Sequence, residues 1–278
     1  MTIRGDAERG AKPPQGKLGC VHAPSRDRVR LPEVMAKTKT PAPRPPSTRD
    51  WSREIRDGGA LGSRLTYDAF GNDRYGCCTC ATYGTIDTTV AARMGTKPVV
   101  TRAVALQAYD AISAWDQALP TANDNGAQIE DAANYFAWWD GDKTANGGLI
   151  PTHVGIDLTR RAEIELAIDL AVAIVVTFDL PKSIWTKKQK VWDVAPRGDY
   201  HEDYERGSLG GHSVGVMGYD GRGILVGTWG QTIVATWEFL SMYHKDGIVP
   251  VHRALAHTTA LTPSGYFARE IIDVVHTL

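Results

Sequence analysis

Residues 71–81 read GNDRYGCCTCA, and this stretch determines how the rest of the chain is interpreted. Gly71 and Gly76, with an Asn-Asp pair between them, predict a turn-rich loop. From Cys78 onward the residues CTCATYGTIDTTVAARMG predict a helix that ends at Gly95. A thiol at the start of a helix is favoured as the thiolate, because the unpaired N–H groups and the helix dipole stabilise negative charge. Cys78 is therefore a candidate nucleophile.

A second stretch, residues 210–220, reads GGHSVGVMGYD and supplies a candidate base. A cysteine nucleophile needs a histidine that is close in space rather than in sequence. Among the eight histidines, His212 follows two glycines and stands at the mouth of an alternating strand, which would give the ring a fixed position. Asn72, six residues before Cys78, is a candidate donor to the oxyanion of a tetrahedral intermediate.

The other cysteines leave alternatives open. Cys80 forms a Cys-x-x-Cys spacing with Cys77 and is a rival nucleophile, although the helix would then have to start two residues later. Cys78 could also be an inert buried thiol. Three cysteines this close together cannot easily reach one tetrahedral zinc ion, so we expect no metal and no cofactor. Their clustering, with only Cys20 elsewhere, argues against a disulfide framework and favours a reducing compartment.

The order of predicted elements indicates an α+β fold. Helices are expected first and short β-branched strands afterwards, with no internal repeat. The expected helices begin at Cys78 and at Thr101 and cover 127–139 and 163–170, and the expected strands cover 171–178, 213–219, 223–228 and 232–235.

These motifs resemble those of the papain-like cysteine peptidase superfamily. The loop 71–81 is similar to the nucleophile loop of papain-like proteins of phages and bacteria, which reads Asn-Asp-x-x-Gly-Asp-Cys-x-x-Ala. Residues 210–220 resemble the family's histidine strand, 228–230 and 235–237 its Ser-Trp-Gly region, and 175–181 the strand before the histidine loop. The likeness covers about residues 60–250. The 134-residue separation of cysteine and histidine also fits the family's spacing of about 130–150.

The resemblance implies a helical half, carrying the nucleophile helix, packed on a C-terminal antiparallel sheet. It implies that Cys78 is the nucleophile and His212 the base, with Asn72 in the place of the papain glutamine. Two positions depart from the family pattern. Cys77 stands where an Asp is usual, and Gly227 stands where papain has the Asn that orients the histidine. Thr228, or a backbone carbonyl, could accept a hydrogen bond from the ring instead.

The expected function is a cysteine peptidase or amidase that acts on a protein or peptide by acyl transfer. The alternative is a catalytically silent papain-like module used for binding or as a virion component. The sequence does not reveal the substrate, because one fold serves many chemistries.

The first 50 residues differ in composition from the rest of the 278-residue chain. Residues 1–50 contain 8 of the 15 prolines and have a net charge of +6, against −7 for 51–278. We therefore expect a disordered basic arm at 1–50, which could bind an acidic or virion partner or simply be solvated, followed by one papain-like domain at 51–278. Met35 begins MAKTKTPAPRPP, which is typical of the start of a short basic leader.

The overall composition is that of an ordinary globular protein. Hydrophobic residues make up 42% of the chain, and its formal net charge is −1, so nucleic acid is not an expected partner of the folded domain. The N-terminus lacks the apolar region of a signal peptide, and no apolar run of about 18 residues is present, so no membrane contact is expected. These features favour a cytoplasmic location, and the resemblance to proteins of phages and bacteria implies a bacterial host cell or a virion.

Overall fold

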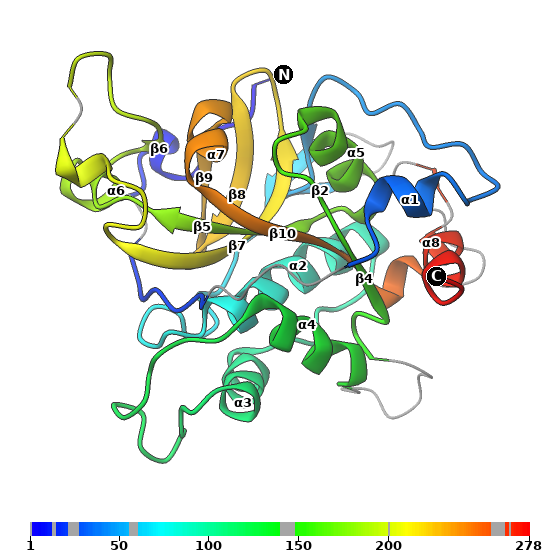
Figure 1. Cartoon of the computed structure of the whole chain (residues 1–278), viewed down its shortest axis with the longest axis horizontal. Helices are drawn as coiled ribbons and strands as arrows, with labels where there is room; N and C mark the ends of the chain where they lie inside the picture. Colours follow the sequence, from blue (N-terminus) through cyan, green and yellow to red (C-terminus); the bar gives the residue numbers. More distant parts are fainter. Residues whose placement is uncertain are drawn as a thin grey trace.

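The computed structural model describes residues 2–12, 15–21, 28–55, 61–139, 148–199, 201–256, 265–266 and 268–278. The longer helices lie in the first two thirds of the chain, and a large sheet is completed by its last third (Figure 1). This is the α+β arrangement expected from the sequence, with the sheet packed on the helix that starts at Cys78.

The four expected helices all form. They are α2 (Cys78–Met94), α3 (Arg102–Ile112), α4 (Ile129–Trp138) and α5 (Arg161–Ala171). Gly95 ends α2 in the left-handed conformation with φ 66°, and the Thr101 side chain caps α3 by accepting from the N–H of Val104. Helix α2 is buried on nearly all sides, because it lies between the sheet and helices α3 and α4 (Figure 1).

The main sheet has the strand order β4-β10-β5-β7-β8-β9-β6, and β1 pairs with β7 off this path. Its strands are β1 (Arg49–Asp50), β4 (Thr152–Gly155), β5 (Ile174–Leu180), β6 (Val191–Trp192), β7 (Gly210–Tyr219), β8 (Gly223–Thr228), β9 (Gln231–Thr236) and β10 (His244–Val251). All pairings are antiparallel except that of β6 with β9. The four expected strands form as β5, β7, β8 and β9, which confirms the predicted sheet.

Several elements were not expected from the sequence. Strand β10 lies beside β5 in the middle of the sheet, although its sequence HKDGIVPV contains charges and a proline that hide the strand pattern. Helices α7 (Trp237–Tyr243) and α8 (Ala268–Val275) are short and complete the packing of the C-terminal half.

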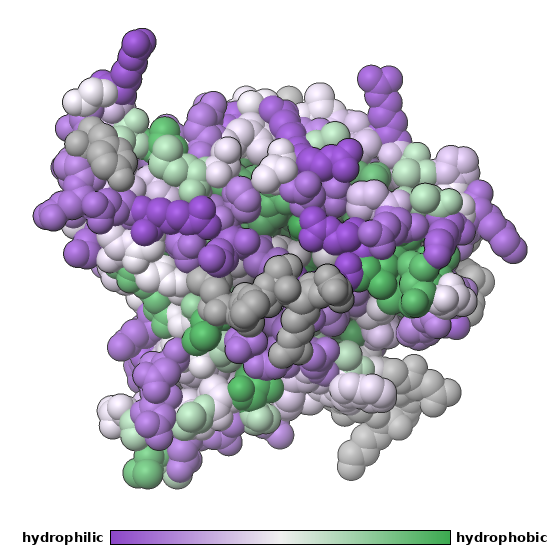
Figure 2. Space-filling model, viewed as in Figure 1, coloured by the Kyte–Doolittle hydropathy of each residue, from purple (hydrophilic) through white to green (hydrophobic). Residues whose placement is uncertain are grey.

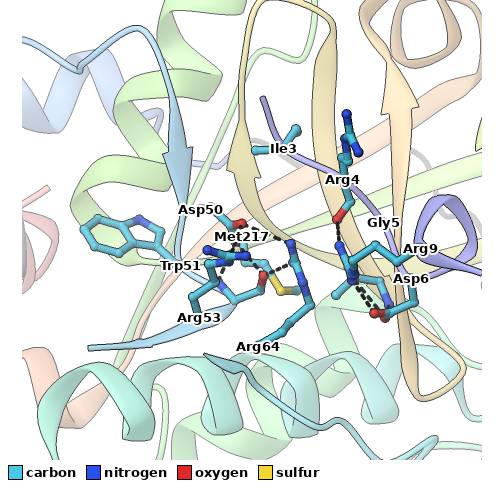
Figure 3. A network of polar contacts seen from close by, with 12 residues as sticks. Ile3, Arg4, Gly5, Asp6, Arg9, Asp50, Trp51, Arg53, Arg64 and Met217 are labelled. Atoms are coloured by element: carbon cyan, nitrogen blue, oxygen red, sulfur yellow. Dashed lines mark hydrogen bonds and ion pairs between the residues drawn. The ribbon is translucent and has the colours of Figure 1, made fainter. Parts of the chain in front are cut away.

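The described residues of the first 50 do not form the expected disordered arm. Ile3 and Leu31 are fully buried, the latter in α1 (Leu31–Met35), because this region supplies apolar side chains to the core of the body. Asp6 accepts hydrogen bonds from the backbone N–H and hydroxyl of Thr232 in β9. Figure 3 shows Asp6 contacting Arg9, and Asp50 contacting Arg64. Residues 1, 13–14 and 22–27 lie outside the described part.

The basic character of this region is partly neutralised within the molecule. Arg49 forms an ion pair with Asp169, and Arg28 forms ion pairs with Glu130 and Asp246. Part of the positive charge of residues 1–50 is therefore paired with negative charge of residues 51–278 in the same molecule.

The face of the molecule seen in Figure 2 is mainly hydrophilic, with small separate hydrophobic groups. Within the described residues, no helix has the length and apolar character that crossing a membrane requires.

Candidate active site

Cys78 is the first residue of α2, as the sequence predicts. The preceding Cys77 is the N-cap, and its carbonyl accepts from the N–H groups of Cys80 and Ala81 at 3.0 and 2.9 Å. This places the Cys78 thiol at the positive end of the helix. Burial nevertheless raises its pKa to about 12, although the N–H groups of Ser213, Thr79 and Gly19 act in the opposite direction. The thiol is only 1% exposed and is protonated at neutral pH in this conformation.

His212 lies near the start of β7, opposite Phe178 of β5. Its ring stacks on Trp229 at 4.3 Å between centroids, with 22° between the planes. Nε2 lies 2.7 Å from the hydroxyl of Thr228, which is the contact proposed from the sequence. Burial lowers the pKa of His212 to about 3, so the ring is neutral at pH 7. Within the described chain, the buried Nδ1 has no hydrogen-bond partner.

The start of α2 and the histidine strand are joined directly. Thr82 donates to the carbonyl of Cys78 at 2.8 Å, and its hydroxyl lies 3.1 Å from that of Ser213, the residue after His212. Cys78 therefore lies against the histidine strand, next to Ser213. Its thiol and the His212 imidazole are not hydrogen-bonded to each other in this conformation, since Nδ1 has no partner.

A small cavity of about 10 Å³ brings three of the four predicted site residues together. Asn72, Cys78 and Thr228 line it, with Ser213 and Trp229, whereas His212 is not among its lining residues. This volume holds about one water molecule, so no substrate group fits without movement. Cys80, the rival nucleophile, is fully buried and does not line the cavity. Among the residues that the structure describes, no group of three or more His, Cys, Asp or Glu side chains is arranged to hold a metal ion.

Asn72, the predicted oxyanion donor, already uses its side-chain amide. Nδ2 donates to the carbonyls of Lys17 and Tyr75 at 3.0 and 2.9 Å. The indole of Trp229 donates to the same Lys17 carbonyl at 3.1 Å. A backbone carbonyl from the N-terminal region therefore accepts a hydrogen bond from Asn72, the donor that the predicted mechanism assigns to the substrate.

Residues 15–21, which we call the plug segment, lie between β7 and the residues just before α4 (dark blue in Figure 1). Gly19 and Cys20 both donate to the carbonyl of Gly211, the residue before His212, at 3.2 and 3.1 Å. On the opposite wall, Ala127 donates to Gly19 at 2.8 Å and accepts from Val21 at 3.0 Å. The result is a parallel β-bridge between Cys20 and Ala127. We call the space between Gly211 and Ala127 the cleft, and an extended part of the same chain occupies it.

Glycines make this close fit possible. A Cβ atom at Gly19 would lie 1.8 Å from the carbonyl oxygen of Gly76, and one at Gly126 would lie 2.0 Å from that of Gly19. Side-chain patterns do not reveal the roles of Lys17, Gly19, Ala127 and Gly211, because these residues act through backbone groups. Gly16 and Gly19 were the available signal, since closely spaced glycines allow one segment of backbone to approach another.

The structure explains why Gly227 does not carry the usual asparagine. A Cβ at Gly227 would lie 2.5 Å from the methyl group of Met217 and 2.7 Å from that of Thr85. This direction leads into the packing between the sheet and α2. Because neighbouring residues of a strand point to opposite faces, Thr228 is the residue of β8 that meets His212. Compared with the papain pattern that the sequence resembles, the residue that contacts the ring lies one position later in the chain.

Replacing Gly227 with asparagine is therefore expected to destabilise the fold, and not to supply a hydrogen-bond partner for His212. Overpacking against Met217 and Thr85 should lower the free energy of unfolding by roughly 1–3 kcal/mol, measured by urea denaturation. Gly221 is the matched control, since a Cβ there meets nothing within 4 Å and asparagine should be tolerated. A Gly227→Asn protein as stable as the wild type would show that this account of the packing is wrong.

Comparison with known proteins supports the fold. The structure is similar to xylellain, a cysteine protease from Xylella fastidiosa, with a TM-score of 0.54 and 13% identity over 87% of this chain and 98% of xylellain. It also matches the proform of Amb a 11, a cysteine protease of ragweed pollen, with a TM-score of 0.47 and 15% identity over 89% of this chain and 73% of that one. No family profile and no curated protein sequence matches. The fold is papain-like, and identities this low establish no more than the fold.

Proposed function

We propose that this chain is a papain-like cysteine hydrolase that cleaves an amide bond in a protein or peptide. The observation that carries the proposal is the position of Cys78 at the start of α2, beside the strand on which His212 is hydrogen-bonded to Thr228. Helix terminus, thiol, imidazole and an orienting hydroxyl are the parts that cysteine acyl transfer requires.

In the proposed reaction the Cys78 thiol gives its proton to His212, and the sulfur attacks the substrate carbonyl carbon. Nδ1 suits this role, because it is the ring nitrogen without a partner, while Thr228 holds Nε2. The oxyanion accepts hydrogen bonds from Asn72 and the Cys78 N–H. His212 then protonates the leaving amine as the C–N bond breaks. Water hydrolyses the thioester and regenerates the thiol.

A peptide substrate is favoured by the backbone groups of the cleft. The Gly211 carbonyl and both backbone groups of Ala127 hold an extended segment in the structure. An extended peptide can use the same groups by strand addition. The substrate must first displace the plug segment, so we propose that the conformation described here is the latent form of the enzyme.

Labelling of Cys78 with iodoacetamide, located by peptide mapping, tests the proposal. The wild-type chain should label slowly at neutral pH, because its thiol is buried and protonated. A Gly19→Val chain, in which the plug segment is displaced, should label readily and hydrolyse a peptide library. Hydrolysis should disappear in the matched Gly19→Val chain with Cys78→Ala. A folded Gly19→Val chain in which Cys78 labels no faster than in the wild type, and which cleaves nothing, would contradict the proposal.

The second candidate function is a catalytically silent papain-like binding module. The observation that favours it is the closed state of the site, in which thiol and imidazole are both neutral, buried and not hydrogen-bonded to each other. Rapid labelling of Cys78 in Gly19→Val without any Cys78-dependent hydrolysis would favour this alternative. Under this alternative, we propose that residues 1–50 bind an acidic partner or a component of a virion.

A further inference from the structure

A larger cavity adjoins the cleft next to the plug segment. It has a volume of about 220 Å³ and lies between the start of α4, strand β10 and the N-terminal region. Cys20, which forms the bridge with Ala127, and Gln128, the residue after Ala127, both contribute to its wall. A side chain projecting from a peptide in the cleft can therefore reach this cavity.

Two carboxylates of the body dominate the cavity and are bridged by one guanidinium. Arg28 donates from Nη1 and Nη2 to the two oxygens of Asp246 at 2.9 and 2.8 Å, and from Nε to Glu130 at 2.8 Å. The side chains of Arg28 and Glu130 are only 11% and 13% exposed. All three groups line the cavity.

Arg28 does not belong to the body that forms the cavity. It comes from the same N-terminal region as the plug segment. Once this region leaves, the remaining charged wall consists of Glu130, Asp157 and Asp246 against Lys245, with His244 beside them. Poorly solvated carboxylates without a cationic partner are costly, so the emptied cavity would attract a cation.

We propose that this cavity binds a cationic side chain of the peptide substrate, arginine above all, and that Arg28 occupies it as an internal substitute. The inference rests on the proposed function. Arginine is favoured over lysine because its planar group can donate to both carboxylates at once, as Arg28 does. Asp246 and Glu130 are then the residues that determine specificity.

The first experiment tests the cavity without relying on catalysis. In full-length Arg28→Ala, N-ethylguanidinium at about 100 mM should raise the melting temperature by roughly 2–4 °C relative to the neutral isostere N-ethylurea. Wild type, with its cavity filled, and Arg28→Ala with Asp246→Asn should show no such rise. Arg30→Ala, at another residue of the same wall, is the matched control. Arg28→Gln replaces Arg28→Ala if the latter does not fold.

The second experiment tests substrate choice. Peptidyl epoxides with arginine or its neutral isostere citrulline at each of the first three positions are compared for labelling of Cys78 in a chain that carries both Arg28→Ala and Gly19→Val, so that the plug segment does not cover the thiol. At one position arginine should label about tenfold faster, and adding Asp246→Asn should remove the difference, whereas Asp157→Asn should not. Equal rates for arginine and citrulline, or no difference between the guanidinium and the urea, would overturn the inference. If iodoacetamide does not label Cys78 in this chain, the proposed function is wrong. The melting experiment still tests whether the cavity binds a guanidinium group, because it does not depend on Cys78.

Discussion

Replacing Gly19 with valine is expected to raise the rate at which iodoacetamide labels Cys78 by about tenfold or more. A Cβ atom at this position would lie 1.8 Å from the Gly76 carbonyl oxygen. Because this oxygen belongs to the backbone, it cannot move aside as the end of a flexible side chain can. If the clash costs the docked segment about 2 kcal/mol, its undocked population rises by more than a factor of ten. Time-resolved labelling followed by peptide mapping measures the rate.

The control for this experiment is Gly221→Ala, which adds a methyl group where nothing lies within 4 Å. It should leave labelling at the wild-type rate. Circular dichroism of both variants checks that the body remains folded. Unchanged labelling in a folded Gly19→Val chain would mean that the plug segment does not limit access to Cys78.

The second large effect concerns acid. His212 has a pKa of about 3 in the folded chain because of its burial, against an ordinary value near 6.5 in the unfolded chain. Between these two values the unfolded state binds a proton that the folded state does not. The stability associated with the neutral ring is therefore complete above pH 6.5 and is lost as the pH falls toward 3. From pH 7 to pH 5 the loss from this one residue should be about 2 kcal/mol in the free energy of unfolding.

Urea denaturation at the two pH values measures this loss. His212→Gln cannot take up a proton, so its stability should fall by about 2 kcal/mol less than that of the wild type over the same interval. His153, whose pKa burial also lowers, adds to the acid sensitivity of both proteins and cancels in the comparison. Identical pH dependence in the two proteins would refute the assignment of the effect to His212.

Much of the structure between residues 71 and 236 could be predicted from the sequence, because the local sequence signals and the tertiary packing favour the same helices and strands there. Gly95 marks the end of α2, and the bounds of β8 coincide with the apolar run 223–228. The alternation of 213–219 predicts a strand that begins just after His212, whereas β7 begins at Gly210 and includes it. The sequence also indicates Thr228 as a candidate partner of the ring, and the two lie 2.7 Å apart. The catalytic roles of Cys78, His212, Asn72 and Thr228 remain proposals.

The N-terminal region could not be predicted by the same means. Its glycines, prolines and charges have the composition of a disordered segment, whereas its structural role depends on backbone carbonyls and N–H groups that pair with Asn72, Ala127 and Gly211. Backbone pairing of this kind depends little on side-chain identity, so the pattern of side chains does not predict it. The buried contacts of Ile3 and Leu31 depend on a partner surface that is formed by distant parts of the sequence.

The occupant of the cleft is covalently tethered to the cleft itself, and this has a consequence for how access is controlled. The local concentration of a tethered ligand is set by the linker and reaches the millimolar range for short flexible linkers. Dilution therefore does not empty the cleft. A free peptide must compete with the plug segment, whose effective concentration stays constant because it is part of the same chain. Exchange between the open and closed forms should proceed at the same rate at nanomolar and at millimolar protein, as a unimolecular step does.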